Sequence, residues 1–205
     1  MLLDFDYSQI EPRIMAHLSG DKRLSEIFHS GKDLYDGVTE ALNLCVCKEH
    51  RRLAKILWLA IAYNAGAFKI SKTAGITFNK AQKFLELMRA SFPELFYWKD
   101  KTIKQAEVNG YVITMFGRKI PLPLEFAHLA PNYKVQGSAA EINKLAMIHT
   151  RQFSPVITVH DEILFDLPDD SQLNEIKSLM ENVVELRVPI KVEAGTGNSW
   201  KESKN

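Results

Sequence analysis

The sequence is poor in cysteine and has no long hydrophobic run, and both shortages limit the kind of protein it encodes. Two cysteines, Cys45 and Cys47, stand in a C-x-C pair, which favours reduced thiols in a cytosolic protein. No neighbouring cysteine or histidine is expected to complete a metal site there. The longest apolar run, residues 56–62, is far too short to span a bilayer, and no basic segment opens a signal peptide. A cytoplasmic protein with no membrane partner is expected.

The chain also has almost no net charge, but its charged residues are unevenly distributed along the sequence. The net charge is +1, yet residues 1–47 carry −4, residues 48–151 carry +10 and residues 152–205 carry −5. A basic middle between two acidic ends suggests that the middle holds a polyanion and the ends hold a cation such as a metal ion. The alternative is a solvated surface with a chance asymmetry.

Hydrophobic patterning predicts an α+β fold, in which a small antiparallel sheet carries a helical insertion. Strands are expected over residues 2–7, 111–116, 156–159, 163–167 and 188–194. One helix is expected to begin at Pro12, because proline suits a first helical turn. Further helices are expected over residues 24–28, 34–42, 48–62, 77–90, 94–109, 132–152 and 171–186.

Acidic residues stand where two of these strands end. Asp6 ends the first strand, and the sequence VHDE places His160, Asp161 and Glu162 at the tip of a hairpin. Two carboxylates from neighbouring strands can bind a pair of Mg²⁺ ions, which prefer oxygen ligands and clamp the attacking and leaving oxygens of a phosphoryl transfer. The alternative is that these acids are ordinary turn residues.

Residues four apart on the 48–62 helix form a stripe that changes from cationic to aromatic. Arg51, Lys55, Leu59 and Tyr63 span a band about 120° wide at 100° per residue. Its cations could hold a triphosphate and Tyr63 could stack on a base. A surface helix with one basic, solvated end is the alternative.

Six segments together resemble the palm and fingers of family A DNA polymerases, the group of bacterial DNA polymerase I and related phage replicases. DYSQIEPRIMAHLSGD (6–21) resembles motif A, RRLAKILWLAIAYNAGAF (51–68) motif B, and VHDE (159–162) motif C. The flanking matches are GYVITMFGRKIPLP (110–123), NYKVQGSAAEINKLAM (132–147) and VPIKVEAGTGNSW (188–200). The resemblance covers nearly the whole chain in the family's order. It implies a first palm part at 1–23, fingers at 24–109 and a second palm part at 110–205.

The resemblance also implies a DNA-directed DNA polymerase that adds dNTPs to a primer 3′-OH, acting in DNA replication with two Mg²⁺ ions, or Mn²⁺ in their place. Its implied metal ligands are Asp6, Asp161 and the backbone carbonyl of Tyr7. Glu162 would support them in catalysis, and Lys55 would donate a proton to pyrophosphate.

The nucleotide and DNA contacts follow from the same motifs. Those implied for the nucleotide are Arg51, Lys55, Leu59, Tyr63, Gln9, His160 and Glu11, the last a steric gate against a ribose 2′-OH. Those implied for the primer-template are Arg13, Arg118, Asn132 and Gln136, with His160 beside the new base pair. Leu59 departs from the family's aromatic residue, and Asn64 replaces a glycine with a residue that tolerates left-handed geometry.

Five residues precede Asp6, whereas family members carry a thumb, and often an exonuclease-type domain, before motif A. A fragment, a split polymerase whose thumb or exonuclease is a separate polypeptide, and a reduced phage-like enzyme are the three explanations. Met1 favours the latter two. Besides a DNA polymerase, two functions stay open: a non-catalytic or partner-dependent nucleic-acid-binding subunit, and a single-subunit RNA polymerase, which Glu11 opposes.

Overall fold

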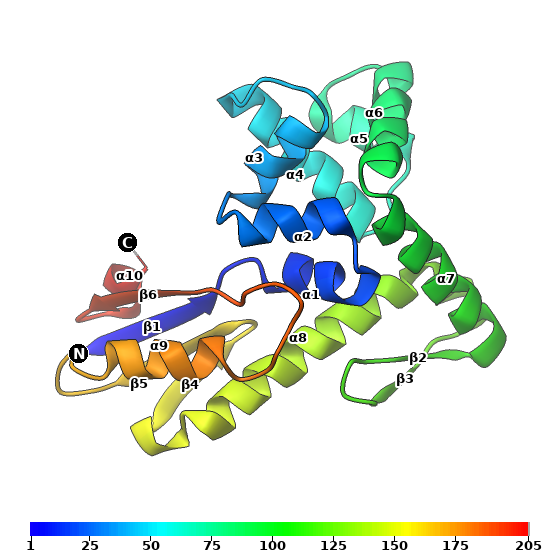
Figure 1. Ribbon diagram of the computed structural model, residues 1–205. Coiled ribbons are helices and arrows are strands. Elements are labelled where there is room, and N and C mark those ends of the chain that lie inside the picture. Colours follow the sequence, from blue (N-terminus) through cyan, green and yellow to red (C-terminus); the bar gives the residue numbers. More distant parts are fainter. Residues whose placement is uncertain (205) are drawn as a thin grey trace. The chain divides into compact units, whose positions relative to one another are not determined.

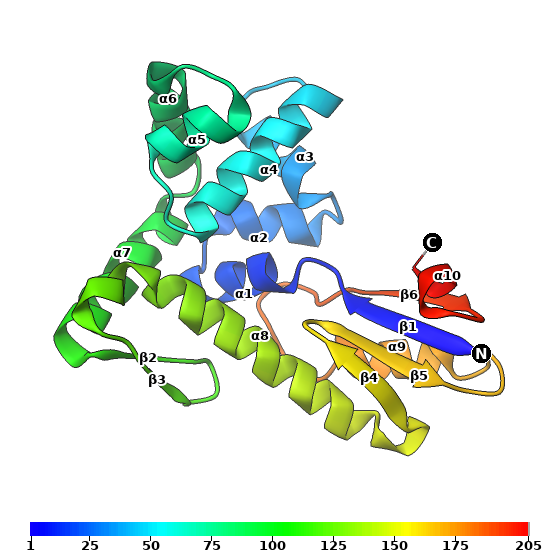
Figure 2. The same cartoon turned by 180° about the vertical axis from the view of Figure 1, so that it is seen from behind.

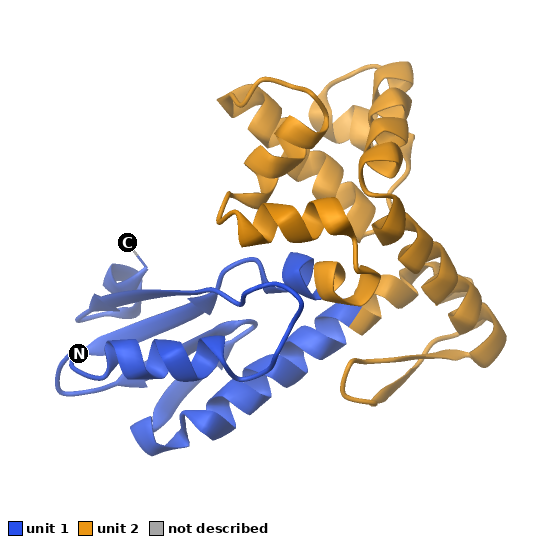
Figure 3. Cartoon of the chain, in the orientation of Figure 1, with its two compact units in different colours: residues 1–14, 135–205 blue, residues 15–134 orange. Residues whose placement is uncertain are grey.

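The computed structural model describes residues 1–204, which form two compact units (Figure 3). Unit 1 combines residues 1–14 with the chain from residue 135 onward, and unit 2 holds residues 15–134. Two helices, α1 (Ile10–Ser19) and α8 (Ala130–His149), run through the unit boundaries. The boundaries expected for the palm and the fingers differ from the boundaries of these two units. The assignment of palm and fingers stays a prediction.

Unit 1 is built on a four-stranded antiparallel sheet (Figure 1). Its strands are β1 (Leu2–Tyr7), β4 (Pro155–Val159), β5 (Glu162–Asp166) and β6 (Val192–Gly197), in the order β4-β5-β1-β6. The N-terminal strand therefore lies between two strands from the C-terminal part of the chain. The predicted α+β class, with a small antiparallel sheet that is discontinuous in sequence, is confirmed.

Alternation along β1 gives the sheet one apolar and one acidic face. Leu3, Phe5 and Tyr7 are buried, and the Phe5 ring meets Phe165 of β5 edge-on with centroids 5.5 Å apart. The Tyr7 hydroxyl donates to the Met180 carbonyl of α9 (Leu173–Glu181) at 3.0 Å, so α9 packs on this apolar face. The intervening Asp4 and Asp6 point to the other face, because successive strand residues alternate.

The acidic face is partly covered by the short helix α10 (Trp200–Ser203). Gly195 of β6 pairs with Asp4, and a Cβ atom at Gly195 would overlap the backbone carbonyl of Ser203. Glycine at this position thus permits α10 to approach the strand closely. The approach brings Trp200 and Lys204 to the acidic face.

Unit 2 is mainly helical (Figure 2). It contains α2 (Lys22–His29), α3 (Leu34–Ala41), α4 (Lys48–Ala62), α5 (Ala67–Ala74), α6 (Phe78–Ser91) and α7 (Pro93–Asn109). A small hairpin follows, β2 (Tyr111–Ile113) with β3 (Lys119–Pro121), and then the 3₁₀ helix η1 (Leu124–Leu129); the second 3₁₀ helix, η2 (Arg151–Phe153), belongs to unit 1. Trp58 of α4 packs edge-on against Phe92, with ring centroids 6.2 Å apart, in the buried centre.

Several predicted boundaries were wrong for identifiable reasons. Helix α1 begins at Ile10, and Pro12 is tolerated because the amides of a first turn have no acceptor within the helix. The strand expected over 111–116 ends at Ile113, since the chain turns at Gly117 (φ 88°) and returns as β3. The last strand begins at Val192, after the expected start at residue 188. Helices α5 and α10 were not predicted.

None of the helices over residues 1–204 combines the length and the apolar character that a membrane crossing requires. This agrees with the short apolar runs of the sequence.

A buried lysine anchors the C-terminal end of α4. Lys99 of α7 is 4% exposed, and its ammonium group donates to the Ile61 carbonyl. Burial, which is offset in part by Asp100, lowers the pKa of Lys99 to about 8 from the ordinary 10.5. The C-terminal end of α4 is therefore held in place by the buried ammonium group of Lys99.

We predict that this lysine makes unit 2 more stable as the pH rises. Between about pH 8 and pH 10.5 the unfolded chain holds a proton that folded Lys99 has released, so the free energy of unfolding increases, by at most about 3 kcal/mol. Urea unfolding across this range should show a smaller increase for Lys99→Met than for wild type. The exposed-site control Lys101→Met should follow wild type, and equal pH slopes for all three proteins would contradict the prediction.

Candidate active site

The register of the sheet gathers acidic residues on one face of unit 1. Asp6 stands opposite Glu162 on β5 and opposite Glu193 on β6. Directly paired residues of antiparallel strands project to the same side, so these three carboxyl groups share a face with Asp4. Together with Lys204 they line a pocket of about 270 Å³. Acidic residues that are distant in sequence thus converge on this face of the sheet.

Asp161 lies in the two-residue loop His160-Asp161 that joins β4 to β5. Glu162, which was expected at the tip, is instead the first residue of β5 and pairs with Val159. His160 has a φ of 57°, a left-handed conformation typical of tight hairpin turns. The backbone amide of Tyr7 donates to the Asp161 carbonyl at 3.3 Å. This bond holds the loop against the end of β1, directly after Asp6.

Asn143 of α8 fixes the shape of this loop. Its buried side-chain amide donates to the His160 carbonyl at 2.7 Å and to the Thr158 hydroxyl at 3.0 Å. The Thr158 hydroxyl in turn donates to the Glu162 carbonyl at 3.2 Å. Asn143 lies in a segment that resembles the family, but its role was not predicted, since a sequence pattern does not show which backbone group a buried amide contacts.

The carboxyl groups of Asp6, Asp161 and Glu11 are harder to ionise than isolated ones. Removal of water, followed by the charges of Asp161, Glu162 and Glu193, raises the pKa of Asp6 to about 6. Burial also raises the pKa of Asp161. For Glu11 on α1, burial first and the charge of Asp161 second raise the pKa. Charged carboxylates are therefore disfavoured here until a cation joins them, and their oxygens are the ligands that hard divalent cations prefer.

Glu162 is buried and held by α10. Lys204 donates to its carboxylate at 2.7 Å, and the Trp200 indole N–H donates to the other oxygen. Burial raises the pKa of Glu162, but these hydrogen bonds outweigh it and leave the pKa below the ordinary value. Burial and the hydrogen bond with Glu162 raise the pKa of neighbouring Asp4 to about 7. Glu162 is thus a charged group whose oxygens are already engaged.

Sequence reasoning missed the partners of this cluster: Asp4, Glu193, Trp200 and Lys204. The two-residue spacing of Asp4 and Asp6 was a usable signal, because it puts both on one face of a strand. The other three become partners only through the register of β6 and the close approach of α10.

In unit 2, the expected stripe lies on the exposed side of α4. Arg51 and Lys55 are exposed, and Leu59 and Tyr63 keep 41% and 49% of their surface accessible. Leu59 and Tyr63 are among the residues that line one pocket of about 130 Å³. Asn64, next after Tyr63, has a φ of 52°, as expected for its left-handed position.

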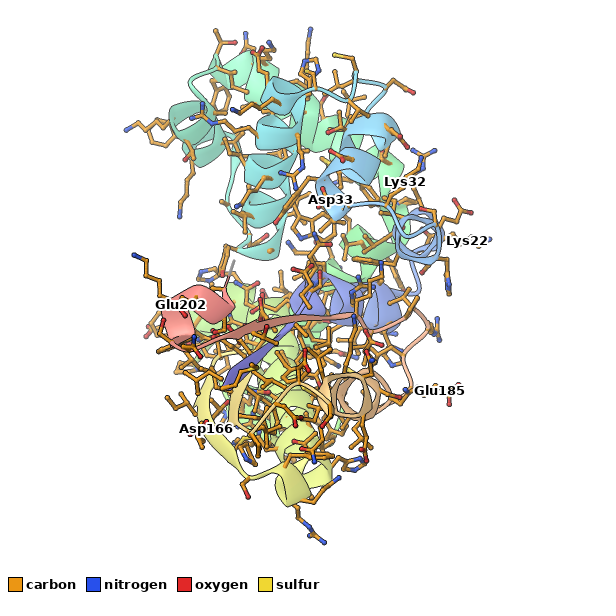
Figure 4. All side chains as sticks on the ribbon, turned by 90° about the vertical axis from the view of Figure 1, so that its left-hand side faces the viewer. Lys22, Lys32, Asp33, Asp166, Glu185 and Glu202 are labelled. Carbon is orange, nitrogen blue, oxygen red and sulfur yellow. The ribbon has the colours of Figure 1, made fainter. Side chains whose placement is uncertain are left out.

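Arg51 is held by acidic residues that sequence reasoning did not connect to it. Its guanidinium pairs with Asp33 at 3.1 Å and with Asp36 at 3.4 Å. Asp33, labelled in Figure 4, also caps the start of α3 through the amides of Tyr35 and Asp36. The Tyr35 ring lies 5.4 Å from the Arg51 guanidinium and 5.9 Å from the Lys55 ammonium. The two cations of the stripe therefore gather over one ring.

Arg13, an expected DNA contact, is a buried residue of unit 1. Its guanidinium donates to the Ser8 carbonyl at 2.8 Å and to the Pro189 carbonyl at 2.5 Å. It thereby ties the chain after β1 to the loop before β6. Burial lowers its pKa. This placement gives Arg13 a structural task besides the DNA contact, which stays a prediction.

The other expected contacts are spread over both units. Gln9 (φ 57°) lies between β1 and α1. Arg118 is exposed in the β2–β3 hairpin of unit 2. On α8, half-buried Asn132 and exposed Gln136 stand four residues apart, so they share one side of that helix.

Comparison with known proteins gives a consistent result. Residues 1–202 match the family described as DNA polymerase family A. The whole chain is 36% identical to the thermostable DNA polymerase I of Thermus filiformis, of which it covers 27%, and 35% identical to DNA polymerase I of Lactococcus lactis, of which it covers 26%.

A solved structure is similar over the full chain. It is the POL domain of Pol1 from M. smegmatis in complex with DNA primer-template and dNTP, with a TM-score of 0.91 and 33% identity, and the chain covers 40% of it. The chain spans about a quarter of the length of the curated relatives it matches. On the family match and these relatives, the chain belongs to DNA polymerase family A.

Proposed function

We propose that this chain carries the nucleotide-addition centre of a DNA-directed DNA polymerase, which joins a dNTP to a primer 3′-OH and releases pyrophosphate. The observation that carries the proposal is the placement of Asp6 and Asp161 at one corner of the sheet, close enough for the charge of one to raise the pKa of the other. The solved relative was captured with primer-template and dNTP, which supports these ligands for the chain.

Family A DNA polymerases use divalent metal ions generally, and the acidic corner suits them. Asp6, Asp161 and the Tyr7 carbonyl would hold two Mg²⁺ ions, with Mn²⁺ as a substitute. When bound, such ions neutralise the charge that develops on the transferring phosphoryl group and its leaving oxygen. The chain's own part is to keep both carboxylates in place, through the β1–β5 register and the Tyr7–Asp161 backbone bond.

Residues of α4 would bind the incoming nucleotide. Arg51 and Lys55 present two cations for the triphosphate, and Lys55 would give a proton to the departing pyrophosphate. Leu59 would face the sugar, and exposed Tyr63 would stack at the templating position. In unit 1, Glu11 would reject a ribose 2′-OH, with Gln9 and His160 near the nucleotide.

The engaged state of Glu162 supports an indirect role for that residue. Because its two oxygens accept hydrogen bonds from Trp200 and Lys204, Glu162 would set the field around Asp6 and would not itself bind metal. Arg13, Arg118, Asn132 and Gln136 would contact the primer-template. We assign unit 1 chiefly to the palm and the helices of unit 2 chiefly to the fingers.

Primer extension by a single nucleotide tests the proposal, because one addition does not require the chain to stay on the duplex. With enzyme in excess over a primer-template and with Mg²⁺, wild type should add the templated dNTP and reject the matching rNTP. Asp161→Asn should reduce the rate at least about 100-fold, because a metal-binding charge is lost. The matched control Asp170→Asn, at an exposed turn residue, should react like wild type.

Two results would refute this prediction. One is a wild-type chain that binds primer-template but adds no nucleotide, which would favour a non-catalytic nucleic-acid-binding subunit. The other is equal rates for wild type and Asp161→Asn, which would show that Asp161 is not part of the metal-binding centre.

A second prediction concerns Leu59. Leu59→Tyr should raise incorporation of dideoxynucleotides relative to dNTPs at least about tenfold. A dideoxynucleotide lacks the polar 3′-OH, and the phenolic hydroxyl of tyrosine beside the sugar would take the place of that group. Leu59→Phe supplies the same ring without the hydroxyl and should leave the ratio near that of wild type. Competition between the two nucleotides on one primer measures the ratio, and an equal effect of both variants would show that ring size alone acts.

A further inference from the structure

The loop between α3 and α4 brings two cysteines and a histidine together. The Sγ atoms of Cys45 and Cys47 lie 3.5 Å apart, and His50 Nδ1 lies 3.1 Å from Cys45 Sγ. All three ligand atoms lie within 4.8 Å of one another. The expectation that no histidine could join the C-x-C pair was wrong. His50 follows three residues after Cys47, in the first turn of α4, and this turn directs its ring back to the loop.

The spacing of these atoms fits a small tetrahedral metal. Zinc bonds of about 2.3 Å to sulfur and about 2.0–2.1 Å to nitrogen require about 3.8 Å between two sulfurs and about 3.6 Å between sulfur and nitrogen. The observed 3.5 Å and 3.1 Å fall short by a few tenths of an ångström. Side-chain rotations can supply so small an opening, and the third pair, Cys47 Sγ and His50 Nδ1, lies within 4.8 Å.

The loop is held at both ends. Asn43 has a φ of 55°, and the Leu44 amide donates to the Thr39 carbonyl at 3.1 Å. Cys47 is the N-cap residue of α4 in an extended conformation, and its carbonyl accepts from the Arg51 amide at 2.9 Å. Both thiols are exposed and His50 is half-buried, which leaves an open path for an ion from solvent.

We propose that Cys45, Cys47 and His50 form a binding site for a thiophilic divalent cation, Zn²⁺ in the first instance, with water as the fourth ligand. Two thiolates and an imidazole are ligands that Zn²⁺ prefers and Mg²⁺ avoids. On binding, both thiols release their protons to solvent. His50 Nδ1, which lies 3.0 Å from the Cys45 carbonyl, gives up that contact for the metal and leaves the ring proton on Nε2.

The site would pin the start of the helix that carries the cationic stripe. His50 is directly followed by Arg51, and a metal would link the first turn of α4 to the preceding loop. Such a link opposes fraying of the N-terminal turn, where helix amides have no acceptor within the helix. This role is structural and does not depend on the acidic corner of unit 1.

Cobalt substitution tests the proposal on the full chain. The protein is reduced with a phosphine, freed of metal, and titrated with Co²⁺ in excess Mg²⁺, which keeps oxygen-ligand sites occupied. We expect the thiolate-to-cobalt charge-transfer band and the intense visible bands of tetrahedral cobalt at one equivalent. Addition of Zn²⁺ should remove them. Release of both thiol protons should accompany binding in a weakly buffered solution.

Variants make the result specific. Cys45→Ser, Cys47→Ser and His50→Ala should each weaken Co²⁺ binding at least about 100-fold, since each removes a ligand. The control His149→Ala removes an exposed histidine of unit 1 and should bind like wild type. Asp161→Asn should also bind normally, so the outcome is separate from that of the polymerase proposal.

Three outcomes would overturn the proposal. The first is the weak spectrum of octahedral cobalt without a charge-transfer band. The second is binding that survives loss of either cysteine. The third is a reduced protein that takes up no cobalt, while its oxidised form contains a Cys45–Cys47 disulfide, which would make the pair a redox element.

Discussion

The pairing of β1 with β5 and β6 is the constraint on which the acidic corner depends. It joins residues 2–7 to residues 162–166 and 192–197, segments that most of the chain separates. Burial of Leu3, Phe5 and Tyr7 beneath the sheet sets the register, because a slip by one residue would turn these side chains to the acidic face. The hydrophobic effect on one face thus determines where the carboxylates stand on the other. A change of register would therefore disrupt both the hydrophobic core and the acidic site.

Clustered carboxyl groups oppose folding, and the structure contains devices that offset this cost. Glu162 is neutralised by Lys204 and receives the Trp200 indole, and the pKa of Asp4 is high enough for it to share a proton with Glu162 near neutral pH. Within residues 1–204 neither Asp6 nor Asp161 forms an ion pair, and both have raised pKa values, because burial outweighs the charges of Lys204 and His160. The uncompensated charge is therefore concentrated on the two residues for which we propose metal ions. Such an imbalance is typical of a site that a cation completes.

The sequence predicted well whatever followed from local periodicity. Strand β1 came from alternation and the exposed stripe of α4 from four-residue spacing, and the hairpin tip at Asp161 came from the apolar runs on either side of it. It predicted poorly what depended on register or on a turn. Trp200 and Lys204 meet Glu162 only because β6 pairs with β1 and Gly195 admits α10. Asn143 and His50 were missed for a similar reason: one reaches a loop from a distant helix, and the other reaches a loop across a helix start.

The ion pairs of Arg51 are compatible with the nucleotide contact that we propose for it. Its partners Asp33 and Asp36 are about one-third exposed, and Arg51 itself is 47% exposed. Ion pairs at such exposed positions contribute about 0–1 kcal/mol, so their exchange for phosphate oxygens costs little. A guanidinium–phosphate contact with two parallel hydrogen bonds would be stronger than these pairs, because Arg51 makes only a single contact with each of the two carboxylates. Asp33 and Asp36 thus hold Arg51 over Tyr35, and the proposed contact with a triphosphate would replace two weak pairs by a stronger one.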